Sequence, residues 1–207
     1  MSGLCDYVDP MTDSDPIDLL ARSLEQVAEL LATVRDDQEA LPTPCRSWTV
    51  AQLGDHLVAD LDKYMITASG GRPDWSAPAP QIRTDRAAAF RDGAADLLAA
   101  WRKAGDLTGT LTLPGLGEVP ARFPLDQQIA EFAMHAWDLA KATGQPVSLD
   151  SEIGQASFDW VRATLKPQFR GDEATGKAFG PEVPVAADAP IYDRLAALAG
   201  RDPSFAV

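Results

Sequence analysis

The sequence predicts an all-α protein: a four-helix bundle with a short β-hairpin or extended crossover before its fourth helix, and a small helical C-terminal extension. Three observations support this fold class. Apolar residues repeat at helical spacing in four long segments, and Pro- and Gly-rich stretches separate these segments. The alternation that is typical of strands is confined to residues 108–123. Long amphipathic helices joined in this way favour a bundle.

The first helix is predicted to begin at Pro16. Asp15 is a suitable N-cap, and proline is favoured at the first helical position. Apolar side chains then follow every three or four residues along one side of the helix: Ile17, Leu20, Leu24, Val27, Leu31 and Val34. The acidic residues 1–14 that precede this helix are predicted to be a disordered lead-in.

The second helix is predicted over residues 50–68. Thr49 and Gln52 have the spacing of a capping box at its start. The apolar positions of this helix are Val50, Leu53, Leu57, Leu61 and Tyr64. Prolines on the N-terminal side (41–48) and Gly and Pro on the C-terminal side (69–82) predict a loop at each end.

The third and fourth helices are predicted over residues 84–104 and 124–143. The apolar stripe of the third is Phe90, Ala94, Leu97 and Trp101, and that of the fourth is Leu125, Ile129, Phe132, Ala136 and Leu139. Gly144 follows the fourth helix, where a glycine C-cap is expected. Two shorter helices near 151–165 and 189–199 form the extension.

Composition and charge exclude several functional classes. The chain has 31 Asp and Glu against 18 Lys and Arg, a net charge of −13, which repels nucleic acid and anionic membrane surfaces. It shows neither a signal peptide nor an apolar stretch near the roughly 20 residues that span a bilayer. Two cysteines are too few for a disulfide framework. We therefore expect a cytoplasmic protein with no nucleic-acid or membrane partner.

The chain contains only two histidines, His56 and His135, so any imidazole chemistry depends on them. In an ideal helix, His56 lies beside the apolar stripe of the second helix. Glu131 and His135 are four residues apart and share a face beside the stripe of the fourth. Side chains placed in this way line a groove between helices. Two imidazoles and one carboxylate suit Zn²⁺ and leave a fourth coordination position open.

Two aspartates stand close to these histidines in the sequence. Asp60 follows His56 by four residues and Asp138 follows His135 by three, so each is placed to orient an imidazole through its second nitrogen. Plainer interpretations also fit the spacing. A histidine on a helix flank is often a boundary residue, and Glu131–His135 is also the spacing of an ordinary helical contact.

Two segments carry a family resemblance: TPCRSWTVAQLGDHLV (43–58) and EFAMHAWDLAKATGQ (131–145). They resemble the metal-binding domain of the mycothiol-dependent maleylpyruvate isomerase family, within the DinB-like superfamily of four-helix bundles. The ending FGPEVPVAADAPIYDRLAALAGRDP (179–203) resembles a short actinobacterial branch of these proteins. The resemblance implies a DinB-like metal-binding bundle over 15–145, with 146–207 as a short helical extension packed on it.

The resemblance also implies a ligand set and a chemistry. His56, Glu131 and His135 correspond to the family's ligands for zinc or another divalent metal. Such a centre activates a low-molecular-weight thiol, with mycothiol as cosubstrate, in an isomerase or S-transferase reaction on a small molecule. The alternative is a non-catalytic metal- or ligand-binding module of stress response. A homodimer is a further expectation, since DinB-like relatives often dimerise.

The chain departs from the resembled isomerase in its length. That isomerase has a second, C-terminal domain that helps to bind substrate and thiol, and residues 146–207 are too few to form it. Arg83 and Arg86, at the start of the third helix, are candidates to attract an anionic substrate, with surface salt bridges as the alternative. Cys45 precedes a helix N-terminus and is a candidate reactive thiol, but a buried, inert cysteine is the favoured interpretation.

Overall fold

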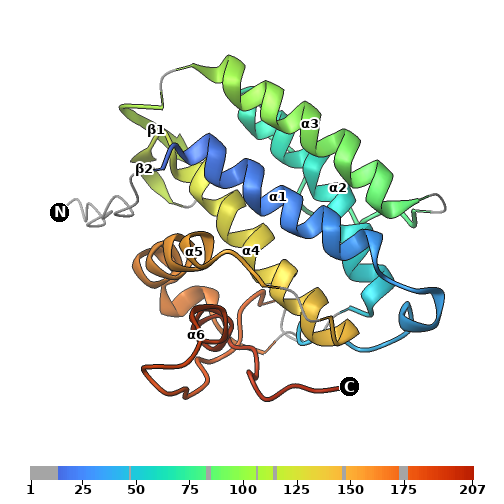
Figure 1. The fold of residues 1–207 in the computed structure, drawn as a ribbon. Helices are drawn as coiled ribbons and strands as arrows, with labels where there is room; N and C mark the ends of the chain where they lie inside the picture. The colour runs from blue at the N-terminus through green and yellow to red at the C-terminus, as the bar shows by residue number, and fades with distance from the viewer. Residues whose placement is uncertain are drawn as a thin grey trace.

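The computed structural model describes residues 14–46, 48–82, 85–105, 107–113, 116–145, 148–172 and 177–207 (Figure 1). Within these ranges the long helices are α1 (Pro16–Ala32), α2 (Val50–Ala68), α3 (Arg86–Ala104) and α4 (Phe123–Thr143). Helices α1 and α2 each pack against both α3 and α4 and lie at opposite corners of the bundle. The predicted four-helix bundle is confirmed. The predicted lead-in, apart from Ser14, lies outside the described residues.

The helix ends follow the local signals in the sequence. The Asp15 carboxylate accepts a hydrogen bond from the backbone N–H of Ile17, and α1 begins at Pro16. Thr49 and Gln52 form the expected capping box: the Thr49 N–H donates to the Gln52 side chain, and the Gln52 N–H donates to the Thr49 hydroxyl. Gly144 ends α4 in the left-handed conformation, with φ of 64°.

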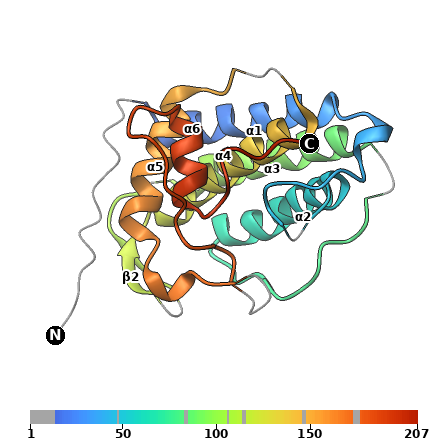
Figure 2. The same ribbon diagram turned by 90° about the horizontal axis from the view of Figure 1, so that it is seen from below.

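The predicted hairpin and extension are also present. Strands β1 (Thr110–Leu113) and β2 (Gly117–Pro120) pair antiparallel, with Leu111 opposite Val119. Helices α5 (Ser151–Thr164) and α6 (Ile191–Leu198) pack against each other and against α4 (Figure 2). They lie on the side of α4 away from α3 (Figure 1). Two short 3₁₀ helices, η1 (Asp36–Gln38) and η2 (Pro167–Phe169), complete the regular elements of the described residues.

Helix α4 is the most enclosed element, because α1, α2, α5 and α6 all pack against it. Its sequence is rich in alanine and large apolar residues, so it buries side chains on every face. One continuous apolar core joins α4 to the bundle and to the extension. Polar residues on α4, such as His135 and Asp138, are therefore buried and need partners within the protein. Among the described residues, no helix is both long and apolar enough to cross a membrane.

Candidate metal centre

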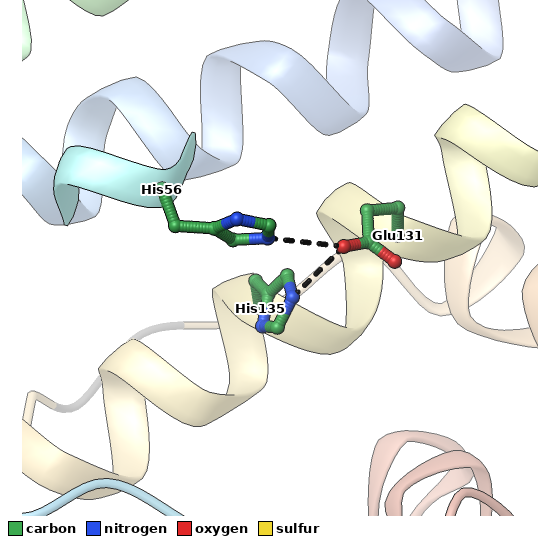
Figure 3. A group of neighbouring side chains, drawn as sticks. All are labelled: His56, Glu131 and His135. Carbon is green, nitrogen blue, oxygen red and sulfur yellow. Dashed lines mark hydrogen bonds and ion pairs between the residues drawn. The ribbon is translucent and has the colours of Figure 1, made fainter. Parts of the chain in front are cut away.

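Three potential metal ligands converge between α2 and α4. His56 comes from α2, and Glu131 and His135 come from adjacent turns of α4 (Figure 3). Nε2 of His56 lies 3.3 Å from Oε1 of Glu131, and Nε2 of His135 lies 3.0 Å from the same oxygen. One ligand atom from each residue lies within 4.8 Å of the other two. The structure thus brings together the three residues that the sequence singled out.

This arrangement fits a divalent metal ion. Zinc bonds to nitrogen and oxygen are near 2.0–2.1 Å, so two ligands of a tetrahedral site lie about 3.3 Å apart. The two measured separations from Glu131 Oε1, 3.3 and 3.0 Å, are close to that value. Two imidazoles and one carboxylate are a common donor set for zinc. The residues present therefore suit the metal that the sequence predicts.

Asp138 contacts the ring nitrogen of His135 that faces away from Glu131. Its Oδ2 lies 2.9 Å from Nδ1 of His135, and an ionised carboxylate only accepts hydrogen bonds. Nδ1 therefore carries the hydrogen, and Nε2 is the nitrogen that faces Glu131. Such a contact fixes the tautomer and the orientation of a ligating histidine. This is the arrangement that the spacing of the two residues predicted.

The charges of the cluster perturb one another strongly. Burial disfavours the charged form of His135, but Glu131 and Asp138 outweigh it and raise the pKa of His135 to about 9. Burial likewise disfavours the Glu131 carboxylate, but His135 and His56 outweigh it and hold its pKa well below the usual range. Without a metal, the cluster is an ion pair between the partly buried Glu131 and the buried His135. A bound cation would replace the proton between them.

Asp60 occupies a different place from the one predicted. Its Oδ2 lies 3.4 Å from Nε2 of His56, the nitrogen that also faces Glu131. Asp60 is therefore on the side of the proposed ligand nitrogen and not on the side of Nδ1. Its Oδ1 lies 3.2 Å from Nζ of Lys63. Burial raises the pKa of Asp60. The interpretation of Asp60 as a group that orients His56 through its second nitrogen is therefore wrong.

A cavity of about 600 Å³ opens beside His56. Its walls come from α2 and from the loops on either side of it, and include Trp48 before α2, Lys63 on it and Trp75 after it. The Trp48 ring stacks on the His56 imidazole, with centroids 4.1 Å apart and planes at 26°. Nζ of Lys63 lies 5.6 Å from the ring of Trp75, which is half exposed. The cluster thus has an accessible side with room for a small molecule.

The other candidate residues lie elsewhere. Arg83 is outside the described residues. Arg86 pairs with Glu39 at 2.6 Å and with Asp55 at 2.7 Å, so it joins α3 to α2 and to the loop before α2 rather than facing the cluster. Arg86 thus forms salt bridges, which is the alternative interpretation of this residue. Cys45 is buried, at 7% exposure, as its favoured interpretation required.

Sequence reasoning missed three residues around the centre. Trp48 packs against the apolar core, and its ring also stacks on His56, a contact that no local signal in the sequence indicates. Lys63 had a usable signal, because His56, Asp60 and Lys63 follow one another at helical spacing on one face of α2. Arg201 contacts Asp138 through a buried ion pair, and nothing in its local sequence indicates that contact.

These features define a class: a helical bundle with a partly buried candidate centre of two imidazoles and one carboxylate, open to a cavity. The chain belongs to the family described as the mycothiol maleylpyruvate isomerase N-terminal domain, whose model matches residues 20–140. The predicted family membership is confirmed.

Known proteins include relatives of this chain. Two uncharacterized proteins of Mycobacterium tuberculosis, from strains CDC 1551 / Oshkosh and ATCC 25618 / H37Rv, are each 38% identical over 191 residues. Each alignment covers 90% of this chain and 98% of the relative. The crystal structure of the mycothiol-dependent maleylpyruvate isomerase aligns with a TM-score of 0.42 and 19% identity, over 68% of this chain. The aligned part is 65% of that isomerase chain, slightly less than two thirds.

Proposed function

We propose that the protein binds a divalent metal ion, zinc before others, through His56, Glu131 and His135. We propose that it uses this centre to activate a low-molecular-weight thiol, such as mycothiol, in an isomerase or S-transferase reaction on a small molecule. One observation carries the proposal: both histidines of the chain meet a shared carboxylate oxygen at 3.0 and 3.3 Å beside a cavity. Family membership supports the thiol.

The protein's own residues prepare the site for that chemistry. A divalent cation held by His56, Glu131 and His135 would favour the deprotonated form of a thiol near neutral pH. Glu131 provides the negative charge that attracts the cation, and Asp138 keeps Nε2 of His135 turned toward it. Trp48 limits the rotation of His56. The cavity beside His56 leaves space for the body of the thiol and for a second substrate.

One observation favours the alternative, a non-catalytic metal- or ligand-binding module of stress response. Asp60 Oδ2 approaches Nε2 of His56 to 3.4 Å from the side of the cavity. A small shift of this carboxylate would supply a fourth protein ligand and close the centre to thiols. Closed centres with four protein ligands are typical of structural zinc sites.

Metal content tests the centre itself. Protein purified without chelators is expected to contain about one metal ion per chain by elemental analysis, and Glu131→Gln is expected to lose most of it. Glu29→Gln removes an exposed carboxylate from α1 and is the matched control, which retains the metal. Substoichiometric metal in wild type, or equal metal in both variants, contradicts the proposal.

Cobalt substitution separates the two candidate functions. A thiol that binds Co²⁺ adds a sulfur-to-metal absorption band in the near ultraviolet, so titration of the cobalt protein with a small thiol should produce this band. A spectrum that does not respond to the thiol supports the closed centre. In that case Asp60→Ala should restore the response, because it removes the further carboxylate that lies 3.4 Å from Nε2 of His56.

The remaining parts of the proposal concern organisation. We place the metal-binding unit in residues 15–145, with 146–207 as its extension, and we place the protein in the cytoplasm. We expect small-molecule partners only and a homodimer in solution, which light scattering on purified protein would test. A monomer would leave the metal centre unaffected, because all three proposed ligands come from one chain.

A further inference from the structure

A buried chain of charged side chains runs from the C-terminal segment to His135. Nη2 of Arg201 lies 3.2 Å from Oδ2 of Asp138, and Nε of Arg201 lies 3.3 Å from Oδ1. The same Oδ2 of Asp138 lies 2.9 Å from Nδ1 of His135. The side chains of Arg201, Asp138 and His135 are only 8%, 0% and 3% exposed. Asp138 therefore bridges a distant arginine and a proposed metal ligand.

The fold directs Arg201 inward by a specific helix ending. After α6, the N–H of Arg201 donates to the carbonyl of Ala196, and the N–H of Gly200 donates to that of Ala197. With Gly200 at φ of 88°, these two bonds form a Schellman motif, which reverses the direction of the chain. Gly200 also lies against the backbone of Gly180, so the turn is held in place from outside.

Asp138 depends on this arginine. A carboxylate with no exposed surface is costly to keep charged unless a cation compensates it. Arg201 supplies the charge, and it grips both carboxylate oxygens from two nitrogens, which also fixes the rotation of the group. Without Arg201, Asp138 would lose the two contacts that fix the rotation of its carboxylate, and its hydrogen bond to His135 would weaken.

From these contacts we propose that Arg201 is a positioning residue of the metal centre: it fixes Asp138, and through Asp138 it holds the His135 ring in the orientation that binds metal. The inference rests on the proposed function and extends it, because Arg201 lies beyond residues 20–140 that match the family model. The extension thereby contributes to a site whose ligands all belong to the bundle.

Metal affinity tests this role, measured by competition with a chromophoric chelator. Loss of a group that orients a ligating histidine typically weakens metal binding 10- to 100-fold. We expect Arg201→Met to weaken zinc binding about tenfold, and Arg201→Lys, which keeps the charge but loses the two-nitrogen grip, to weaken it less. Arg170→Met is the matched control: Arg170 holds the same segment through the carbonyls of Gly180 and Leu198, without contact to Asp138.

A second background shows whether Arg201 acts through Asp138. In an Asp138→Asn protein the carboxylate that Arg201 holds is gone, so addition of Arg201→Met should change zinc affinity little. If Arg201→Met alone does not fold, the zinc affinity of Arg201→Lys is compared with that of wild type. In the Asp138→Asn background, the affinity of the Arg201→Met/Asp138→Asn double variant is compared with that of Asp138→Asn. Equal weakening in both backgrounds, or weakening by Arg170→Met as strong as by Arg201→Met, overturns the inference.

Nitrogen NMR of the metal-free protein gives an independent measure. Wild type should show the Nδ1–H of His135 in a slowly exchanging hydrogen bond, and Arg201→Met should lose that protection while Arg170→Met retains it. Wild type that binds no zinc would defeat the proposed function. Wild type that binds zinc, with Arg201→Met binding equally tightly, would defeat only the role of Arg201.

Discussion

The turn at Gly200 offers a quantitative test of how the C-terminal segment is held within the extension. Gly200 has φ of 88°, and a Cβ built there would lie 2.6 Å from Cα of Gly180 and 2.7 Å from two further backbone atoms. Gly144 also has positive φ, 64°, but a Cβ there would meet nothing within 4 Å. Both glycines end a helix, so the pair separates backbone strain from steric overlap.

The two substitutions are expected to differ by the cost of that overlap. A left-handed backbone costs an alanine roughly 1–2 kcal/mol, which is the whole expected effect of Gly144→Ala. Gly200→Ala adds a clash with backbone that cannot rotate away, worth roughly 1–3 kcal/mol by analogy with overpacked cores. We expect Gly200→Ala to lower the free energy of unfolding by about 3 kcal/mol, or roughly 6–12 °C in Tm for a chain of this size.

Urea unfolding followed by circular dichroism measures both variants, and zinc competition then reports on the centre. Because Gly200 precedes Arg201, Gly200→Ala should also weaken zinc binding, whereas Gly144→Ala should not. Equal destabilisation by the two variants would refute the steric argument. Strong destabilisation by Gly200→Ala with unchanged zinc affinity would refute the link between the turn and the metal centre.

Zinc binding, the ring of Trp48 and the hydroxyl of Tyr192 give three further tests. Zinc at 100 times its Kd should stabilise the protein by about 2.7 kcal/mol and raise Tm by roughly 5–11 °C, and Glu131→Gln should abolish this shift in a thermal scan. Trp48→Ala removes the ring stacked on His56 and should weaken zinc binding severalfold, while Trp48→Phe should retain most of the affinity. Equal zinc affinities of Trp48→Ala and wild type would contradict the role of Trp48. Burial raises the pKa of Tyr192 to about 12, so the stability that this hydroxyl contributes is complete below pH 10 and is lost between pH 10 and 12. Tyr192→Phe should remove that part of the alkaline loss, and urea unfolding at pH 9 and 11 measures it.

The helix ends were predicted best, because residues close together in the sequence determine them. Asp15, the Thr49–Gln52 pair and Gly144 act on backbone groups within a few residues, so their roles followed from spacing and are confirmed. Helix phase likewise placed His56 and His135 on the flanks of their helices. It could not set the relative height of α2 and α4, which depends on packing along the whole bundle and brings the two imidazoles to one carboxylate.

What the sequence could not predict depends on contacts between distant segments. Arg86 stands at a helix start like many surface arginines, and only the fold shows that Glu39 and Asp55 hold it. Trp48 lies in the loop before α2, and its contact with the imidazole ring of His56 has no local signal in the sequence. Arg201 and Asp138 are 63 residues apart, and a Schellman turn after α6, in the extension, brings them together.

The charge of the centre connects its structure with the proposed thiol chemistry. Around the cluster, Arg201 compensates Asp138 and Lys63 compensates Asp60, which leaves Glu131 as the unmatched carboxylate once both imidazoles are neutral. A divalent cation would turn this single negative charge into a single positive one. A partly buried positive charge favours one anionic ligand from the cavity, and a deprotonated thiol has that charge. The net charge of −13 therefore does not oppose an anionic ligand here, because the local balance rather than the protein's total governs a buried site.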